Sequence, residues 1–312
     1  MKKTILLSLL AAAFLTACSS DDPEPQAPKQ EEQPSQQEPR LLTVEVSETP
    51  LADANGTPNQ IKTRTAEATT TASLSSFFMN YQDSKNEFTK DGSTWSTATW
   101  PTTTSAGVEI KDSDKLDFYA YRDNSDKDVA TLIWETTTSP YLSFTLDPHP
   151  SSHLDLLVAK STVARSDHGG KVPLTFDHAC AAVKFNVIKT SGADGHTIVI
   201  TSVKLSNVKD HGQYYFNATG VGEDTKWKSL SGSADYTLTD GDITLSDYDT
   251  HPLPCGYLFL IPQTKSGKTL TVNYTLDNTA KTRDFSLSGT WEAGLEYTIN
   301  IYIGKSFIEE QS

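Results

Sequence analysis

The side chain with the most clearly defined chemistry is the thiol of Cys18. Two lysines near the start are followed by an apolar run at 5–15, and Leu15-Thr16-Ala17 stands directly before the cysteine. This is the order of a secretion signal followed by a lipobox, where small residues fit a signal peptidase and the cysteine sulfur carries a diacylglycerol. The run is shorter than the roughly 20 residues of a membrane-spanning helix. We therefore predict a removable signal peptide at 1–17 and palmitate-type acyl chains on Cys18 that hold the exported protein at a membrane.

Seven histidines raise the question of a metal or catalytic centre. They stand singly or in loops, and none belongs to a His-Glu-x-x-His pair. His178, the one beside an apolar strand pattern, is expected to have a core or hydrogen-bonded role instead of a ligand or nucleophile role. The sequence also has no Gly-x-Ser-x-Gly elbow and no glycine-rich phosphate loop. We therefore predict a non-enzymatic protein without metal or cofactor, while a carboxylate pair that converges only in the fold stays open as an alternative.

Two cysteines remain beyond the lipobox, Cys180 and Cys255. Export to an oxidising compartment would allow a disulfide between them. Cys180 stands among small and apolar residues, where a buried thiol behaves like any small hydrophobic side chain. The sequence leaves both interpretations open.

The tryptophans are the residues best suited to contact a sugar ring. We expect Trp134 and Trp291, which stand beside strand patterns, to be mostly in the core. Trp95 and Trp100 are expected to be more exposed, and a flat platform formed by them would indicate glycan binding.

Composition limits the partners. The chain has 26 basic and 40 acidic residues, a formal charge of −14, and this argues against binding to nucleic acid or to an anionic membrane surface. The segment 18–40 is rich in Pro, Gln and Glu and almost free of apolar side chains, so it cannot bury enough surface to fold. We predict that it is a solvated tether between the lipid and the folded body.

The body alternates apolar and polar residues at period two, as in Leu42-Thr43-Val44-Glu45-Val46 and Val183-Lys184-Phe185-Asn186-Val187. Such alternation indicates strands with one buried face, and turn-forming clusters separate the strands. We predict an all-β protein of antiparallel sandwiches. The length suits two domains, at 41–171 and 172–312, with the boundary at the Gly-rich loop that ends at Lys171.

Several segments taken in order carry a family resemblance. They include Lys62-Thr63-Arg64-Thr65, Leu116-Asp117-Phe118-Tyr119-Ala120-Tyr121, Val172-Pro173-Leu174-Thr175-Phe176-Asp177-His178-Ala179, Leu260-Ile261-Pro262-Gln263-Thr264 and Gly289-Thr290-Trp291-Glu292-Ala293-Gly294. Each is weak alone, but their order and spacing resemble the fimbrillin family of Bacteroidetes fimbriae, particularly its minor-fimbrium-like branch. The resemblance covers about residues 60 to 303.

The resemblance implies two tandem transthyretin-like sandwich domains, delivery as a lipoprotein and assembly into a fimbrium by strand exchange. In that mechanism a protease cuts after an arginine and removes the first strand, and the strand of another subunit fills the open groove. Arg64 matches the family's cleavage position, with Arg40 as the weaker candidate. Leu42, Val44 and Val46 would form the removable strand.

One departure from the family concerns the C-terminus. Stalk-type members carry a further donor strand, whereas only 304–312 follow the last strand pattern here. This departure argues against a polymerising stalk role and favours an anchor, a tip adhesin or a non-assembling surface relative. The expected function is a fimbrial structural or adhesive subunit of the outer membrane and cell surface, as an anchor, tip or stalk component. Its partners would be other fimbrial subunits and a glycan or protein receptor. The alternative is a surface glycan-binding lipoprotein of a nutrient-uptake system.

Overall fold

The computed structural model describes residues 40–52, 74–82, 84–122, 130–133, 140–217, 226–304 and 308–311. These residues form strands almost throughout, with one short helix, α1 (Arg165–His168), and two 3-10 turns, Pro150–Ser152 and Ser191–Ala193. The all-β prediction is confirmed. Among the described residues no helix has the length and apolar character that crossing a membrane requires.

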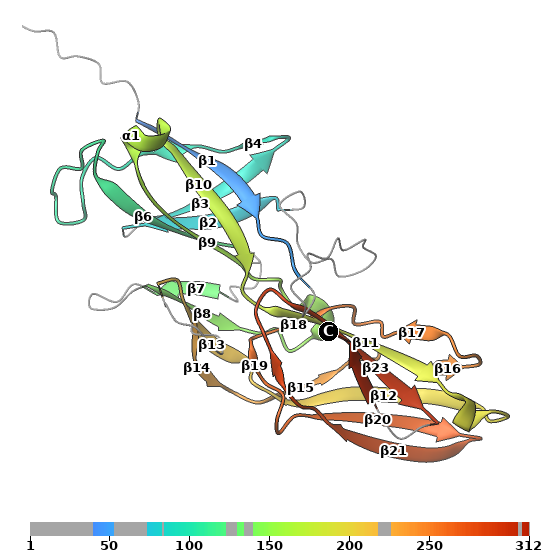
Figure 1. Ribbon diagram of the computed structural model, residues 1–312. Helices are drawn as coiled ribbons and strands as arrows, with labels where there is room; N and C mark the ends of the chain where they lie inside the picture. Colours follow the sequence, from blue (N-terminus) through green and yellow to red (C-terminus); the bar gives the residue numbers. More distant parts are fainter. Residues whose placement is uncertain are drawn as a thin grey trace, which may run out of the picture. The chain divides into compact units, whose positions relative to one another are not determined.

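The first part of the chain builds an eight-stranded sheet in the order β4-β3-β2-β6-β9-β10-β1-β5 (Figure 1). Its strands are β1 (Leu41–Glu48), β2 (Ser76–Tyr81), β3 (Ser84–Asp91), β4 (Thr94–Trp95), β5 (Ala98–Thr99), β6 (Lys115–Tyr121), β9 (Leu157–Ala164) and β10 (Lys171–His178). All neighbours pair antiparallel except β1 and β10, which run parallel.

The other described strands form four smaller sheets, in the orders β17-β11-β23-β24, β15-β12-β20-β21, β14-β13-β8-β7 and β19-β22, with β18 on β11 and β16 on β12. Their bounds are β7 (Ala130–Ile133), β8 (Tyr141–Thr145), β11 (Ala181–Lys189), β12 (Ile198–Val208), β13 (His211–Tyr215), β14 (Trp227–Ser231), β15 (Ala234–Thr237), β16 (Ile243–Leu245), β17 (Thr250–Pro252), β18 (Leu258–Leu260), β19 (Gln263–Thr264), β20 (Thr269–Leu276), β21 (Thr279–Ser286), β22 (Thr290–Trp291), β23 (Glu296–Ile303) and β24 (Ile308–Gln311).

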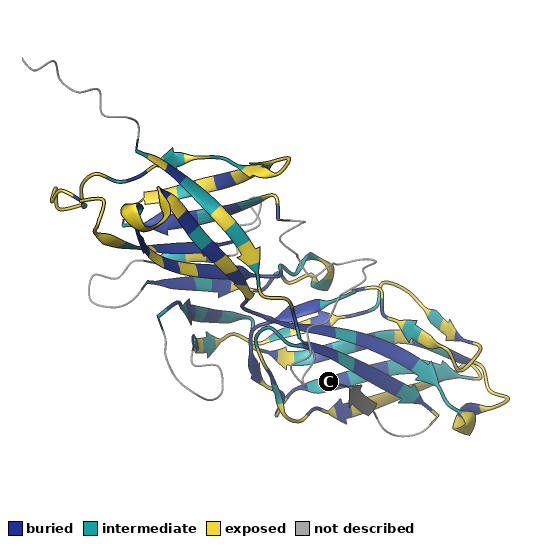
Figure 2. Cartoon of the chain, turned by 45° about the horizontal axis from the view of Figure 1, so that its top comes forward, coloured by how far each residue is buried: buried dark blue, intermediate teal, exposed yellow. Residues whose placement is uncertain are grey.

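The buried apolar side chains gather in two clusters, and buried positions alternate with exposed ones along many strands (Figure 2). In β10 the alternation is regular, because Val172, Leu174 and Phe176 are buried while the residues between them are not. The division of the body into 41–171 and 172–312 stays a prediction. The structure adds that Lys171 begins β10, which pairs with β9 and β1, and that β8 pairs with β13 from beyond that boundary.

Candidate functional site

The first described strand, β1, is the element to which the sequence assigned a function. It runs parallel to β10 from Thr43, opposite Lys171, to Glu48, opposite Phe176. On its other side β5 pairs with only Leu41 and Leu42. In Figure 1 the β1 arrow lies alongside β10, a strand that follows it by more than a hundred residues. A single long-range partner thus holds most of β1 in the sheet.

The side chains of β1 that point inward are apolar. Leu42 is completely buried and Val44 and Val46 are half-buried, and all three pack in the same cluster as Phe176. Full burial of one such side chain stabilises by roughly 1.5–3 kcal/mol. The predicted strand is therefore present, and its apolar side chains pack in the hydrophobic core. Its removal stays a proposal.

Gly170 allows β1 to approach the sheet closely. Its φ is +86°, a left-handed conformation that glycine adopts easily, and a Cβ at this position would lie 2.6 Å from the carbonyl oxygen of Leu41. The Gly170 carbonyl also accepts a hydrogen bond from the Thr43 N–H at 3.1 Å. The loop before β10 is thus shaped to receive the beginning of β1.

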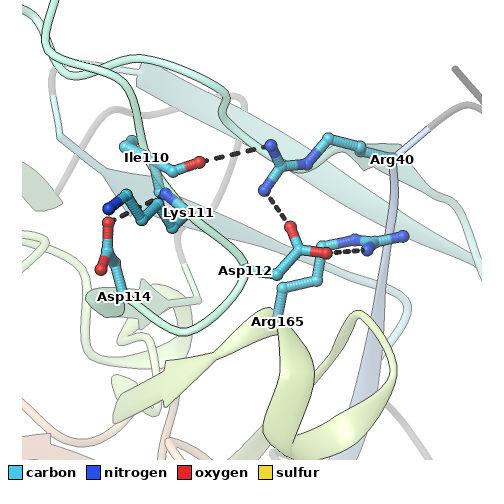
Figure 3. A network of polar contacts seen from close by, with 6 residues as sticks. All are labelled: Arg40, Ile110, Lys111, Asp112, Asp114 and Arg165. Carbon is cyan, nitrogen blue, oxygen red and sulfur yellow. Dashed lines mark hydrogen bonds and ion pairs between the residues drawn. The ribbon is translucent and has the colours of Figure 1, made fainter.

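The N-terminal end of β1 is fixed by a shared carboxylate (Figure 3). Asp112 pairs with Arg40 on one side and with Arg165 of α1 on the other, the latter at 2.7 Å. Arg40 also donates to the carbonyl of Ile110 at 3.3 Å, and its own carbonyl accepts from the Trp100 N–H at 2.6 Å. Because these side chains are partly exposed, each ion pair is worth only about 1 kcal/mol or less.

The C-terminal end of β1 is fixed by a buried ionic cluster. His178 donates from Nδ1 to Asp155 at 3.0 Å and from Nε2 to Glu48, the last residue of β1, at 3.0 Å. The side chains of His178, Asp155 and Glu48 are 2%, 1% and 9% exposed. The charge of Arg122 also acts on this group through Asp155. The prediction of a hydrogen-bonded core role for His178 is confirmed.

The two carboxylates keep His178 charged. Burial is the largest influence on its pKa and lowers it, but the hydrogen bonds and negative charges of Asp155 and Glu48 together outweigh burial and raise the pKa to about 9. The doubly protonated imidazolium can donate from both nitrogens at neutral pH. A charged histidine therefore ties the end of β1 to the end of β10.

This cluster predicts a pH dependence of stability. The pKa of histidine in the unfolded chain is about 6.5, below the folded value, so the contribution of the cluster is complete below about pH 6.5 and is lost as the pH rises through about 9. We expect the melting temperature to fall over this window more steeply in the native chain than in a His178→Gln variant. Thermal denaturation followed by circular dichroism at several pH values measures the two slopes, and equal slopes would contradict the assignment.

The structure describes only some of the other residues to which the sequence assigned a role. Cys18, Arg64 and Trp134 lie outside the described residues. Cys180 and Cys255 are described and buried, and each is a thiol, so the bridge that the sequence left open is not formed. Burial raises the pKa of Cys255 to about 12, which makes this thiol unreactive at neutral pH.

The two tryptophans that were expected to be exposed differ. Trp100 is 0% exposed and packs against Phe118 with ring centroids 5.3 Å apart, so the expectation was wrong for this residue. The cause is β5, which pairs with β1 and carries Trp100 into the core. Trp95 is half-buried, with its ring against Phe77 at 4.9 Å. The two rings therefore do not form a surface platform, and Trp291 is buried as expected.

Sequence reasoning did not find Asp155, Glu48, Asp112 or Arg165. No local pattern marks them, since each meets its partner only in the folded sheet. Among the described residues, no group of three or more His, Cys, Asp or Glu side chains is placed to hold a metal ion. The geometry around β1 is that of a strand held at both ends by ion pairs.

Comparison with known proteins gives a family match and structures of similar fold. A family model described as fimbrillin-like matches residues 56–312. A fimbrial protein from Bacteroides vulgatus has a similar solved structure, with a TM-score of 0.55 and 15% identity over 87% of this chain and 98% of that one. A structure described as a candidate cell adhesion protein from Bacteroides ovatus gives a TM-score of 0.50 and 11% identity over 88% and 97%. At these identities the similarity concerns the fold.

A weaker similarity, with a TM-score of 0.41 and 12% identity, relates 86% of this chain to 95% of the fimbrial anchor protein Mfa2 from Porphyromonas gingivalis. No curated protein sequence matches the chain.

Proposed function

The chain belongs to the fimbrillin-like family, and we propose that it is a non-catalytic structural or adhesive subunit of a fimbrium at the cell surface. The observation that carries the proposal is the placement of β1. An N-terminal strand fills the core of the eight-stranded sheet, pairs mainly with β10, and is followed in sequence by Arg64. A strand in that position can be exchanged without rebuilding the rest of the fold.

The proposed assembly step is strand exchange after cleavage. A cut after Arg64 would separate β1 from the body and leave only non-covalent contacts to retain it. Its loss would open the site of Leu42 and uncover the unpaired edge of β10. An extended strand of another subunit could then restore both the apolar contacts and the backbone hydrogen bonds.

Lipid anchoring completes the proposal. The lipobox at Cys18 and the tether to Arg40 would hold the uncut protein at the outer membrane, because several acyl chains give firm attachment. An anchor subunit would keep β1, whereas a tip or stalk subunit would lose β1, tether and lipid together. Near the C-terminus, Ile308–Gln311 form β24, which pairs with β23 of the same chain. This pairing supports a role in which the subunit does not donate this strand to a neighbouring subunit.

Limited proteolysis tests the proposal. We expect an arginine-specific protease to cut after Arg64 in preference to Arg40, because Arg40 is held by Asp112 and Ile110. Intact mass and size-exclusion chromatography before and after cleavage would then show release of the N-terminal segment that ends at Arg64, β1 included, and formation of oligomers. Arg64→Gln is the matched control and should remain whole and monomeric.

Two outcomes separate the roles. Cleavage with release and oligomers supports a tip or stalk subunit. Resistance at Arg64, together with co-purification of other fimbrial subunits, supports an anchor. A protein that is monomeric after β1 is lost and that associates with no fimbrial subunit would overturn the assembly function.

The alternative function is glycan binding by a surface lipoprotein of a nutrient-uptake system. The burial of Trp100 counts against it, since Trp95 is then the one remaining ring of the expected pair at the surface. Retention on a polysaccharide affinity gel that is lost in a Trp95→Ala variant would favour this function.

A further inference from the structure

The outer edge of β1 has backbone groups that point away from β10. The N–H groups of Thr43 and Thr49 donate to carbonyls next to and within β10, at 3.1 and 2.8 Å. Backbone groups of successive residues in a strand point to opposite sides, so those of Val44 and Val46 point to the other side. These residues therefore offer N–H donors and carbonyl acceptors at the normal spacing of a strand.

A neighbouring strand occupies only the beginning of this edge. β5 pairs antiparallel with β1 through two rungs, Leu41 with Thr99 and Leu42 with Ala98. Within the described part of the chain, no strand continues this pairing along 43–48. The first rungs show that an antiparallel strand fits here, and the following rungs are open.

Beside the open rungs the surface is hollowed. The hollow has a volume of about 460 Å³ and is lined by Val44, Glu45, Val46, Lys90, Ser93, Trp95 and Lys171. Lys90 and Trp95 belong to β3 and β4, which end the sheet on the side opposite to β1 and β5. The hollow is therefore a gap between the two ends of the eight-stranded sheet.

The lining indicates the chemistry of an occupant. The valine side chains and the partly exposed ring of Trp95 suit apolar groups, and the ammonium groups of Lys90 and Lys171 outnumber the single carboxylate of Glu45. Backbone donors repeated at strand spacing recognise a peptide backbone, which a saccharide does not reproduce. A segment of alternating apolar and acidic residues satisfies all of these features.

We infer that the outer edge of β1 accepts an extended peptide with alternating apolar and acidic side chains, which adds a strand in the gap between β1 and β3–β4. This site differs from the groove of the proposed assembly step, because β1 stays in place and Arg64 need not be cut. It is an additional interaction surface of the uncleaved protein.

The test uses the uncleaved chain and a fluorescein-labelled peptide of about six residues that alternates valine and glutamate, long enough for the open rungs. Fluorescence anisotropy should show binding. A peptide with lysine in place of glutamate, and a Lys90→Glu/Lys171→Glu variant, should each bind at least about tenfold more weakly. Binding of the acidic peptide should also weaken with added salt.

A proline at Val46 tests the backbone contact directly. Val46→Pro removes an N–H that points outward, which an edge strand tolerates, and should weaken binding by about tenfold or more. Ser47→Pro is the matched control, since it removes an N–H that points to β10 and should destabilise the sheet. If Val46→Pro does not fold, a peptide N-methylated at alternate residues should lose binding to the unaltered chain in the same way.

Amide hydrogen exchange gives a second readout. Peptide binding should slow exchange at Val44 and Val46 more than at Glu45 and Ser47, whose amides already face β10. Absence of peptide binding would overturn the inference. So would a Val46→Pro variant that binds the acidic peptide as tightly as the native chain does, together with an N-methylated peptide that binds the native chain as tightly as the unmodified peptide does. Binding of polygalacturonate that is lost in Trp95→Ala but unchanged in Val46→Pro would instead identify a saccharide site.

Discussion

Replacement of His178 by leucine is expected to lower the free energy of unfolding by about 3–5 kcal/mol. The change leaves Glu48 and Asp155 as buried carboxylates without their shared cation, and breaking a buried ion pair by removing one partner costs about that much. Because Glu48 ends β1, we also expect faster amide exchange along this strand. Urea denaturation and hydrogen exchange measure the two effects.

A triple variant provides the control for this prediction. Adding Glu48→Gln and Asp155→Asn to His178→Leu removes the uncompensated charges, so it should recover a large part of the lost stability. A single variant within about 0.5 kcal/mol of the native chain, the range of ordinary surface substitutions, would show that the cluster does not hold β1.

Substitution of Leu42 by aspartate is expected to release β1 without any protease. Leu42 is 0% exposed and packs in the core of the eight-stranded sheet, where no cation is placed to receive a carboxylate from this position among the described contacts. The loss of apolar burial, together with a buried charge, costs more than the roughly 2–5 kcal/mol of an alanine substitution. The chain can avoid that cost by expelling one peripheral strand instead of unfolding.

The adjacent residue supplies a matched control. Leu41 is 49% exposed, so Leu41→Asp should change stability by no more than about 0.5 kcal/mol. Amide exchange should show loss of protection in β1 and at the facing edge of β10 in Leu42→Asp only. The same variant should bind an added peptide of sequence 41–48, and failure to bind it would indicate that the groove collapses once β1 leaves.

These two variants address different parts of the proposed mechanism. His178→Leu weakens the attachment of β1 at its end, while Leu42→Asp removes the apolar side chain that fills the groove. If both release β1 and only Leu42→Asp accepts the added peptide, the ionic cluster acts as a latch and the apolar groove as the acceptor. Attachment and filling of the groove would then depend on separate residues of β1, Glu48 and Leu42.

Several features follow from the sequence alone. The period-two alternation around Val44 and in 183–187 predicted strands that the structure contains, and the position of His178 beside an apolar strand predicted its buried, hydrogen-bonded state. Alternation is a local property, since side chains on successive residues of a strand face opposite sides whatever the strand pairs with. For this reason the all-β class and the apolar face of β1 could be predicted.

The tertiary structure alone decided which strands are partners. Trp100 was expected to be more exposed, but pairing of β5 with β1 buries it. Likewise, the contact between Glu48 and His178 joins residues 130 positions apart. Sequence spacing determined which face of each strand is apolar, whereas long-range pairing determined what covers that face, because hydrogen bonds between strands carry no local signal of their partner.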